Sequence, residues 1–184
     1  MAREVMVCSP GSASSHASDQ KRQAKRRTFS VSSCAGCHGP LSIFTSTSWM
    51  DARYRDAFVR VGDNNVSVDD NKVESAPEII SRNGLNIKLP RASISLLYSY
   101  TAKSYADALN TRTPSANGSV GIVPAYGLFD INTSWKISNQ IMLRVNVNNV
   151  ANKQYFTKRP QFYPGPGVWS SDGRSFVVTV GFTI

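Results

Sequence analysis

The residues with the most reactive side chains lie close together near the start of the chain. All three cysteines and both histidines fall within the first 38 of 184 residues, and Cys34-Ala-Gly-Cys37-His38 forms a C-x-x-C-H motif. This motif attaches c-type haem: both thiols bond to the haem and the histidine binds its iron. No helical periodicity surrounds the motif, and a zinc site would need further ligands at suitable spacing. We therefore expect no metal and no resident cofactor here, and a small haem-binding electron carrier is kept as an alternative.

A basic run precedes this motif. Residues 1–40 hold six Lys or Arg against two Asp or Glu, so they carry +4 of the formal net charge of +9. Five of these cations lie between Lys21 and Arg27 and could contact nucleic acid or anionic lipid. No interleaved aromatic residues accompany them, so we expect a solvated charged tail and no nucleic-acid partner. Because few large apolar residues are available to bury, residues 1–40 are predicted to be disordered and unrelated to the rest.

From Leu41 onward, apolar and polar residues alternate with the period of a β-strand. This alternation is clearest at the end of the chain, where one face is expected to carry Phe176, Val178, Val180, Phe182 and Ile184. Similar patterns predict further strands at about 42–53, 78–89, 92–102, 128–137 and 141–148. The chain is therefore predicted to be all-β, an antiparallel meander of about six strands. Residues 41–184 contain no Cys or His and only scattered carboxylates, so we expect no enzyme.

The connections between the predicted strands alternate in length. Leu89-Pro90-Arg91 and Ser138-Asn139 make tight hairpin turns, whereas residues 54–77, 103–125 and 150–174 form long links. Outer-membrane barrels combine short periplasmic turns with long extracellular loops, and their strands have an apolar outer and a polar inner face. On that polar face we expect Asp130 and Arg144 to form an ion pair. A soluble β-sandwich binding module with solvated outer faces is the alternative.

Several segments resemble TonB-dependent outer-membrane receptors. Residues 146–156, Asn-Val-Asn-Asn-Val-Ala-Asn-Lys-Gln-Tyr-Phe, are similar to the pattern on the penultimate strand of that family. Residues 163–182 look like its last extracellular loop and closing strand. Shorter segments that look like the ferric dicitrate (siderophore) branch begin at Tyr98, Ser104 and Pro124, and further similar segments are 49–58 and 74–80. The resemblance covers residues 41–184.

The resemblance implies the C-terminal part of a 22-stranded barrel that imports ferric chelates across the outer membrane of a Gram-negative bacterium. The partners implied are the chelate, the TonB energy-transducing complex, the barrel-assembly machinery and outer-membrane lipid. The iron chelate would be cargo and not a cofactor. Ferric citrate is anionic, so cationic and hydrogen-bonding loop residues should line its site, although some could instead pack the loops. The candidates are Arg112, Lys158, Arg159, Tyr163, Trp169 and Arg174.

The sequence also departs from the family that it resembles. No secretory signal peptide is visible, because only Val5-Met6-Val7 follows Arg3 before a polar segment begins. The last residue is Ile184, where the family usually ends in an aromatic residue that the assembly machinery reads. About six strands are fewer than the eight of the smallest closed barrels. We therefore expect two parts, a tail of residues 1–40 and a barrel segment of residues 41–184. We expect this barrel segment not to be competent for transport alone.

Overall fold

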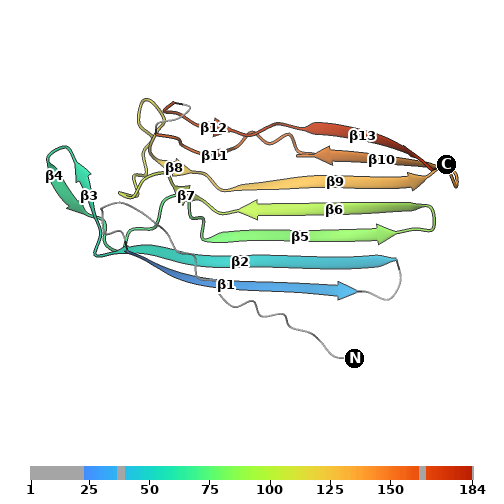
Figure 1. Cartoon of the computed structure of the whole chain (residues 1–184), viewed down its shortest axis with the longest axis horizontal. Coiled ribbons are helices and arrows are strands. Elements are labelled where there is room, and N and C mark those ends of the chain that lie inside the picture. The colour runs from blue at the N-terminus through green and yellow to red at the C-terminus, as the bar shows by residue number, and fades with distance from the viewer. Residues whose placement is uncertain (1–22, 37–39, 162–164, 184) are drawn as a thin grey trace.

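A computed structural model describes residues 23–36, 40–161 and 165–183. Seven strands form one antiparallel sheet in the order β1-β2-β5-β6-β9-β10-β13 (Figure 1). Their bounds are Gln23–Gly36 for β1, Leu41–Arg55 for β2, Ile79–Lys88 for β5, Ala92–Thr101 for β6, Tyr126–Lys136 for β9, Ile141–Asn148 for β10 and Ser175–Phe182 for β13. The prediction of an all-β antiparallel meander is confirmed. Within the described ranges, no helix is long and apolar enough to cross a membrane.

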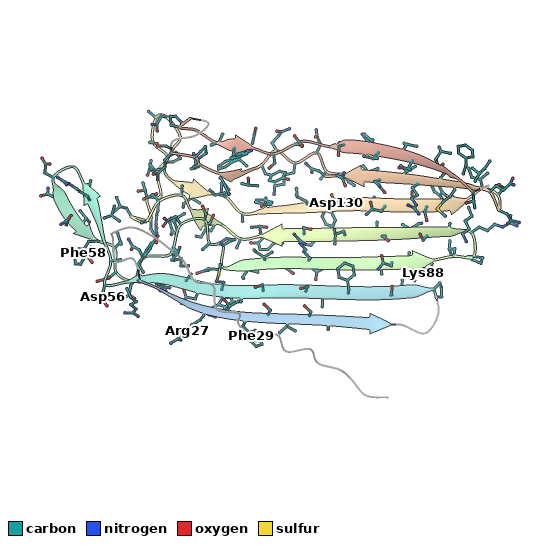
Figure 2. All side chains as sticks on the ribbon, viewed as in Figure 1. Arg27, Phe29, Asp56, Phe58, Lys88 and Asp130 are labelled. Atoms are coloured by element: carbon teal, nitrogen blue, oxygen red, sulfur yellow. The ribbon has the colours of Figure 1, made fainter. Side chains whose placement is uncertain are left out.

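All long links lie at one end of the sheet, which we call the long-link end, and the short turns lie at the other (Figure 1). Each long link contains a small two-stranded ribbon. The ribbons pair β3 (Phe58–Val61) with β4 (Asn64–Ser67), β7 (Ser104–Tyr105) with β8 (Ile122–Val123), and β11 (Phe156–Lys158) with β12 (Trp169–Ser170). Figure 2 shows this polarity through two labelled residues, with Phe58 at the long-link end and Lys88 at the other. The predicted alternation of long and short connections is therefore confirmed.

The register of the sheet collects the apolar residues of successive strands on one side. Leu143 on β10 lies opposite Trp135 on β9 and Val180 on β13, and directly opposed residues share a face. We call this side the apolar face, and the side defined by Asn132 and Asn146 the polar face. Four of the residues predicted for the apolar face of β13 lie there and are at least half exposed, at 65%, 64%, 51% and 73%, and they are Phe176, Val178, Val180 and Phe182. Ile184 lies outside the described residues.

This arrangement is not that of a β-sandwich. A sandwich covers the apolar face of one sheet with a second sheet. Within the described ranges, the other three sheets are the short ribbons of the long links, and each has two strands. The apolar face is therefore left uncovered, and an uncovered apolar surface of this extent indicates contact with lipid or with another protein.

Strand β1 is a difference from the sequence-based expectation. Residues 23–36 pair with β2 along their whole length, from Gln23 opposite Arg55 to Gly36 opposite Ser42. The prediction of disorder is therefore wrong for this stretch, and the sheet has seven strands where about six were expected. The alternation in β1 involves two large apolar residues, Phe29 and Val31, which is too short a pattern to recognise without its partner strand. The division of the chain at Leu41 into unrelated parts stays a prediction.

Two polar pairs interrupt the apolar face at its β2–β5 contact. Thr45 Oγ1 donates to Asn83 Oδ1 at 2.6 Å, and the hydroxyls of Thr47 and Ser81 lie 2.9 Å apart. The Asn83 amide also donates to Ser81 Oγ at 3.1 Å. Because these groups are hydrogen-bonded to one another, they tolerate apolar surroundings better than unpaired polar groups would.

The buried core lies in the links at the long-link end and not beneath the sheet. Its centre consists of Tyr54, Ala57, Val68 and Ala108, which come from the end of β2 and from the first two long links. The backbone of Tyr54 is bonded to Asn71 O at 2.9 Å, and the Asn110 side chain bonds both backbone groups of Lys72 at 2.8 Å. These contacts give the long links a defined arrangement on which exposed side chains can be held.

Candidate functional site

The last long link brings two of the predicted ligand-binding residues together. Lys158 on β11 is the cross-strand partner of Trp169 on β12, and both side chains are exposed. Trp169 is 55% exposed, which is unusual for so large an apolar side chain. An exposed lysine paired with an exposed tryptophan gives this ribbon a cation and an aromatic surface, which suits a bulky anionic ligand.

A groove of about 380 Å³ lies beside Trp169. It is lined by Trp169 and by its neighbours in the chain, namely Pro160, Gly165, Pro166, Gly167, Val168 and Ser170. Gly165 and Gly167 have φ values of 149° and 155°, which side chains rarely adopt, so the Gly-Pro-Gly segment itself shapes the groove. The volume is within the usual range for small-ligand sites.

Arg159 points away from the ligand surface and into the loops. Its Nε donates to Ile122 O at 3.1 Å and its Nη1 donates to Gly118 O at 2.9 Å. The guanidinium carbon also lies 4.7 Å from the centre of the Phe156 ring. Gly118 has a φ of 73°, which favours glycine, and it lies against Gly167 of the last link, whose Cα would be 3.4 Å from a Cβ at this position, an ordinary contact. Arg159 therefore joins the second and third long links.

The other predicted ligand-binding residues are not gathered at the groove. Arg112 is exposed in the second long link, and Arg174 is exposed just before β13, where its backbone N–H donates to Asn152 Oδ1 at 3.0 Å. Tyr163 lies outside the described residues. Ligand binding by all six residues stays a prediction.

The predicted ion pair on the polar face does not form. Arg144 lies opposite Ser134, four residues along β9 from Asp130. Asp130 Oδ1 instead accepts a hydrogen bond from the backbone N–H of Asn149 at 2.8 Å. Asn149 has a φ of 49° at the end of β10, so the Asp130 carboxylate helps to fix the start of the last long link.

The C-x-x-C-H motif is only partly described. Cys34 falls in β1 opposite Phe44, whereas Cys37 and His38 lie outside the described residues. Within the described ranges, no group of three or more His, Cys, Asp or Glu residues could hold a metal ion. The absence of a resident cofactor stays a prediction.

Sequence reasoning missed a cluster of charged residues at the long-link end of β1 and β2. A pocket of about 370 Å³ is lined by Arg27, Asp51, Arg53, Arg55 and Asp70. The signal was present in the sequence, because Asp51, Arg53 and Arg55 continue the alternation of β2 after Trp49. The alternating positions after Trp49 carry charged residues, so a search for alternating apolar residues ends at Trp49.

One lysine near this cluster has a perturbed ionisation. Burial lowers the pKa of Lys72, and the nearby Arg53 guanidinium lowers it further. Asp51 raises that pKa and Lys103 lowers it, with smaller effects. The Lys72 ammonium also pairs with the Glu78 carboxylate, which joins the middle of the first long link to the residue before β5.

Comparisons with known proteins agree with this architecture. No family model matches the sequence. Over 94 residues, the chain is 30% identical to the probable TonB-dependent siderophore receptor PiuA of Acinetobacter baumannii. The aligned stretch makes up 51% of this chain and 11% of that receptor. This sequence similarity confirms the predicted resemblance to TonB-dependent siderophore receptors.

Solved structures show the same fold. The siderophore receptor PiuA from Acinetobacter baumannii superposes with a TM-score of 0.72 at 20% identity, over 88% of this chain and 22% of that one. The ferric citrate transporter FecA gives a TM-score of 0.63 at 22% identity, over 77% and 20%. The ferric yersiniabactin uptake receptor FyuA from Yersinia pestis gives 0.68 at 12% identity, over 88% and 24%.

The chain thus spans about a tenth of the curated relative that it matches and between a fifth and a quarter of these three structures. Its sheet has the fold of a segment of a TonB-dependent receptor barrel, as predicted. The named proteins are receptors and transporters and not enzymes, in agreement with the expectation for this chain.

Proposed function

We propose that this chain is the C-terminal barrel segment of a TonB-dependent outer-membrane receptor for ferric chelates. The observation that carries the proposal is a single sheet with one uncovered apolar face and with all its long links at one end. Such a face suits hydrocarbon around it, and the polar face suits a watery lumen. The similarity to a siderophore receptor supports the same conclusion.

In this proposal, the long-link end faces the outside of a Gram-negative cell and meets the chelate. Trp169 in the groove and Lys158 on the paired strand would bind an anionic ferric chelate, and Arg112, Tyr163 and Arg174 are further candidates for its contacts. Ferric dicitrate is one such ligand, because its carboxylates accept hydrogen bonds from cationic side chains. Uptake would draw energy from the TonB complex, and β13 would be the strand that the barrel-assembly machinery reads.

The described segment would not transport a chelate alone. The smallest closed barrels have eight strands, and strands β1 and β13 are the two open edges of this seven-stranded sheet. Open edges leave backbone N–H and C=O groups without partners, which is costly in hydrocarbon. Transport would therefore need the other strands of a complete receptor.

Membrane insertion is tested with two matched variants in the middle of β13. Val178→Arg places a charge on the apolar face, whereas Thr179→Arg places the same charge on the polar face. A charge on the lipid face near the bilayer centre costs about 2–4 kcal/mol, so V178R should fold into lipid vesicles much less efficiently than T179R. Protease protection in vesicles measures this. Equal tolerance of both variants, or a stable monomer without detergent, would contradict the proposal.

Chelate binding is tested through the quenching of tryptophan fluorescence by ferric iron. The chain has three tryptophans, and Trp135 lies near the short-turn end of β9. Ferric dicitrate added to the chain in vesicles should quench wild type and W135F but not W169F, and K158Q should weaken the binding. If W169F is quenched as strongly as wild type, the groove is not the chelate site.

A further inference from the structure

The pocket between β1, β2 and the first long link has a position that chelate binding does not explain. We call it the arginine pocket, and its cations are Arg27, Arg53 and Arg55. Arg27 lies opposite Asp51, and the next row of the same face toward the sheet centre pairs Phe29 with Trp49. Figure 2 shows Arg27 closer than Phe29 to the long-link end of β1. The pocket therefore opens on the same side as the apolar face and not on the polar face.

Two aspartates orient the arginines without using all of their donors. Arg53 Nε lies 3.0 Å from Asp51 Oδ1, and Arg53 Nη1 donates to Asp70 O at 3.0 Å. Arg55 Nη2 lies 3.2 Å from Asp70 Oδ1. A guanidinium carries five N–H donors, so each of these two side chains keeps several for a ligand.

Arg27 is the least committed cation of the pocket. Within the described part of the chain, no carboxylate lies within ion-pair distance of its guanidinium. Three guanidinium groups face two carboxylates in the pocket, which leaves a local excess of one positive charge. An anion that bridges Arg27 and Arg53 would neutralise this excess.

The row below the pocket identifies the depth at which such an anion would sit. Phe29 is 64% exposed and Trp49 is 43% exposed on the uncovered face. Exposed aromatic rings are typical of the boundary between hydrocarbon and headgroups. Arginines one row further out would therefore lie at headgroup level, where basic pockets attract lipid phosphates.

We propose that the arginine pocket binds a phosphate of an anionic lipid headgroup in the leaflet next to the long links. This inference rests on the proposed insertion of the sheet into a membrane. Arg27 and Arg53 would donate charge-assisted hydrogen bonds to the phosphate oxygens, and Asp51 and Asp70 would hold the arginine side chains in place. The lipid chains would then lie along the apolar face beneath the pocket.

The full chain folded in detergent micelles provides the test, with bisphosphorylated lipid A as the probe. Dephosphorylated lipid A and inorganic phosphate are added in parallel. The double variant R27Q/R53Q should bind lipid A roughly 20-fold more weakly than wild type, and R27Q alone about fivefold more weakly. The matched control R82Q removes an exposed arginine from the polar face of β5, opposite Ser46 and Ser99, and should bind as wild type does.

The outcomes separate this inference from the proposed function. Lipid A binding that is equal in wild type and R27Q would overturn the lipid site while leaving membrane insertion intact. Displacement of lipid A by inorganic phosphate at equal concentration would also overturn it, because the site would then select free phosphate. A chain that forms no β-structure in micelles or vesicles would overturn both proposals. R27Q separates loss of the site from loss of the fold, because this substitution breaks no ion pair of the described structure.

Discussion

Arg159 Nη1 donates a hydrogen bond to Gly118 O at 2.9 Å, and this contact between residues 41 positions apart in sequence joins two long links. The same guanidinium reaches Ile122 O and stacks over the Phe156 ring. The groove beside Trp169 belongs to the last link alone, but its position depends on the second link through Arg159. An arginine expected to hold a ligand thus holds the loop that carries the site.

Replacing Arg159 should loosen both links. In Arg159→Lys the single ammonium cannot make both backbone contacts or stack over Phe156 in the same way. Hydrogen bonds to a charged group contribute about 1.5–3 kcal/mol, so local opening should become at least tenfold more frequent. Hydrogen exchange of the backbone amides between 115 and 123 measures this. Lys158→Gln is the control, and equal protection in both variants would refute the bracing role.

Phe44 and Gly84 are a second coupled pair, directly opposed on β2 and β5. A Cβ at Gly84 would overlap one edge of the Phe44 ring, 1.9 Å from Cε1, so Gly84→Ala must displace the ring. Overpacking of this kind costs about 1–3 kcal/mol of unfolding free energy. The cost should nearly vanish when Phe44→Ala is already present, which a double-mutant cycle in micelles measures. Additive effects of the two changes would show that the ring does not cover the glycine.

Asp130 should matter for the turn that follows β10 and not for charge pairing. Asp130→Ala leaves the N–H of Asn149 without its acceptor, and Asn149 is only 4% exposed. We expect a loss of about 1–3 kcal/mol, measured by urea unfolding in micelles. Asp130→Asn keeps an amide oxygen and should lose less. Asn132→Ala, two residues along the same face, is the control, and a loss as large as that of D130A would contradict this role.

The strands were predictable from sequence because their alternation depends on side chains alone. Phe176, Val178, Val180 and Phe182 repeat with period two, and that pattern requires one shared face. β1 could not be recognised in this way. Its two large apolar residues become significant only through pairing with β2, which is a contact between strands and not a property of the segment itself.

The site was less predictable because loop chemistry depends on where a side chain points. Lys158 and Arg159 are adjacent cations in the sequence, yet one lies exposed opposite Trp169 and the other donates into a neighbouring link. No periodicity distinguishes them. The arginine pocket was missed for the opposite reason, because the strand pattern that places Arg53 and Arg55 is regular but is charged and not apolar.

Lys72 provides a prediction on pH. Burial and the Arg53 guanidinium lower its pKa below the ordinary value of 10.5, so the fold disfavours the charged amine. Between the lowered pKa and 10.5, the unfolded chain binds more protons at this site than the folded chain does. The free energy of unfolding therefore increases as the pH rises through that interval. Below the lowered pKa, Lys72 is charged in both states and destabilises the folded chain by its full amount.

The pKa is measured from the pH dependence of Lys72 acetylation by mass spectrometry, because only the neutral amine reacts. In the folded chain, the midpoint should fall below that of the same lysine in the urea-unfolded chain. Arg53→Gln removes one of the causes and should move the folded midpoint part of the way back, since burial remains. Arg82→Gln, on the polar face of β5, should leave the midpoint unchanged. A folded midpoint equal to or above the unfolded one would contradict this prediction, and would mean that the Glu78 carboxylate paired with Lys72 outweighs burial and the Arg53 charge.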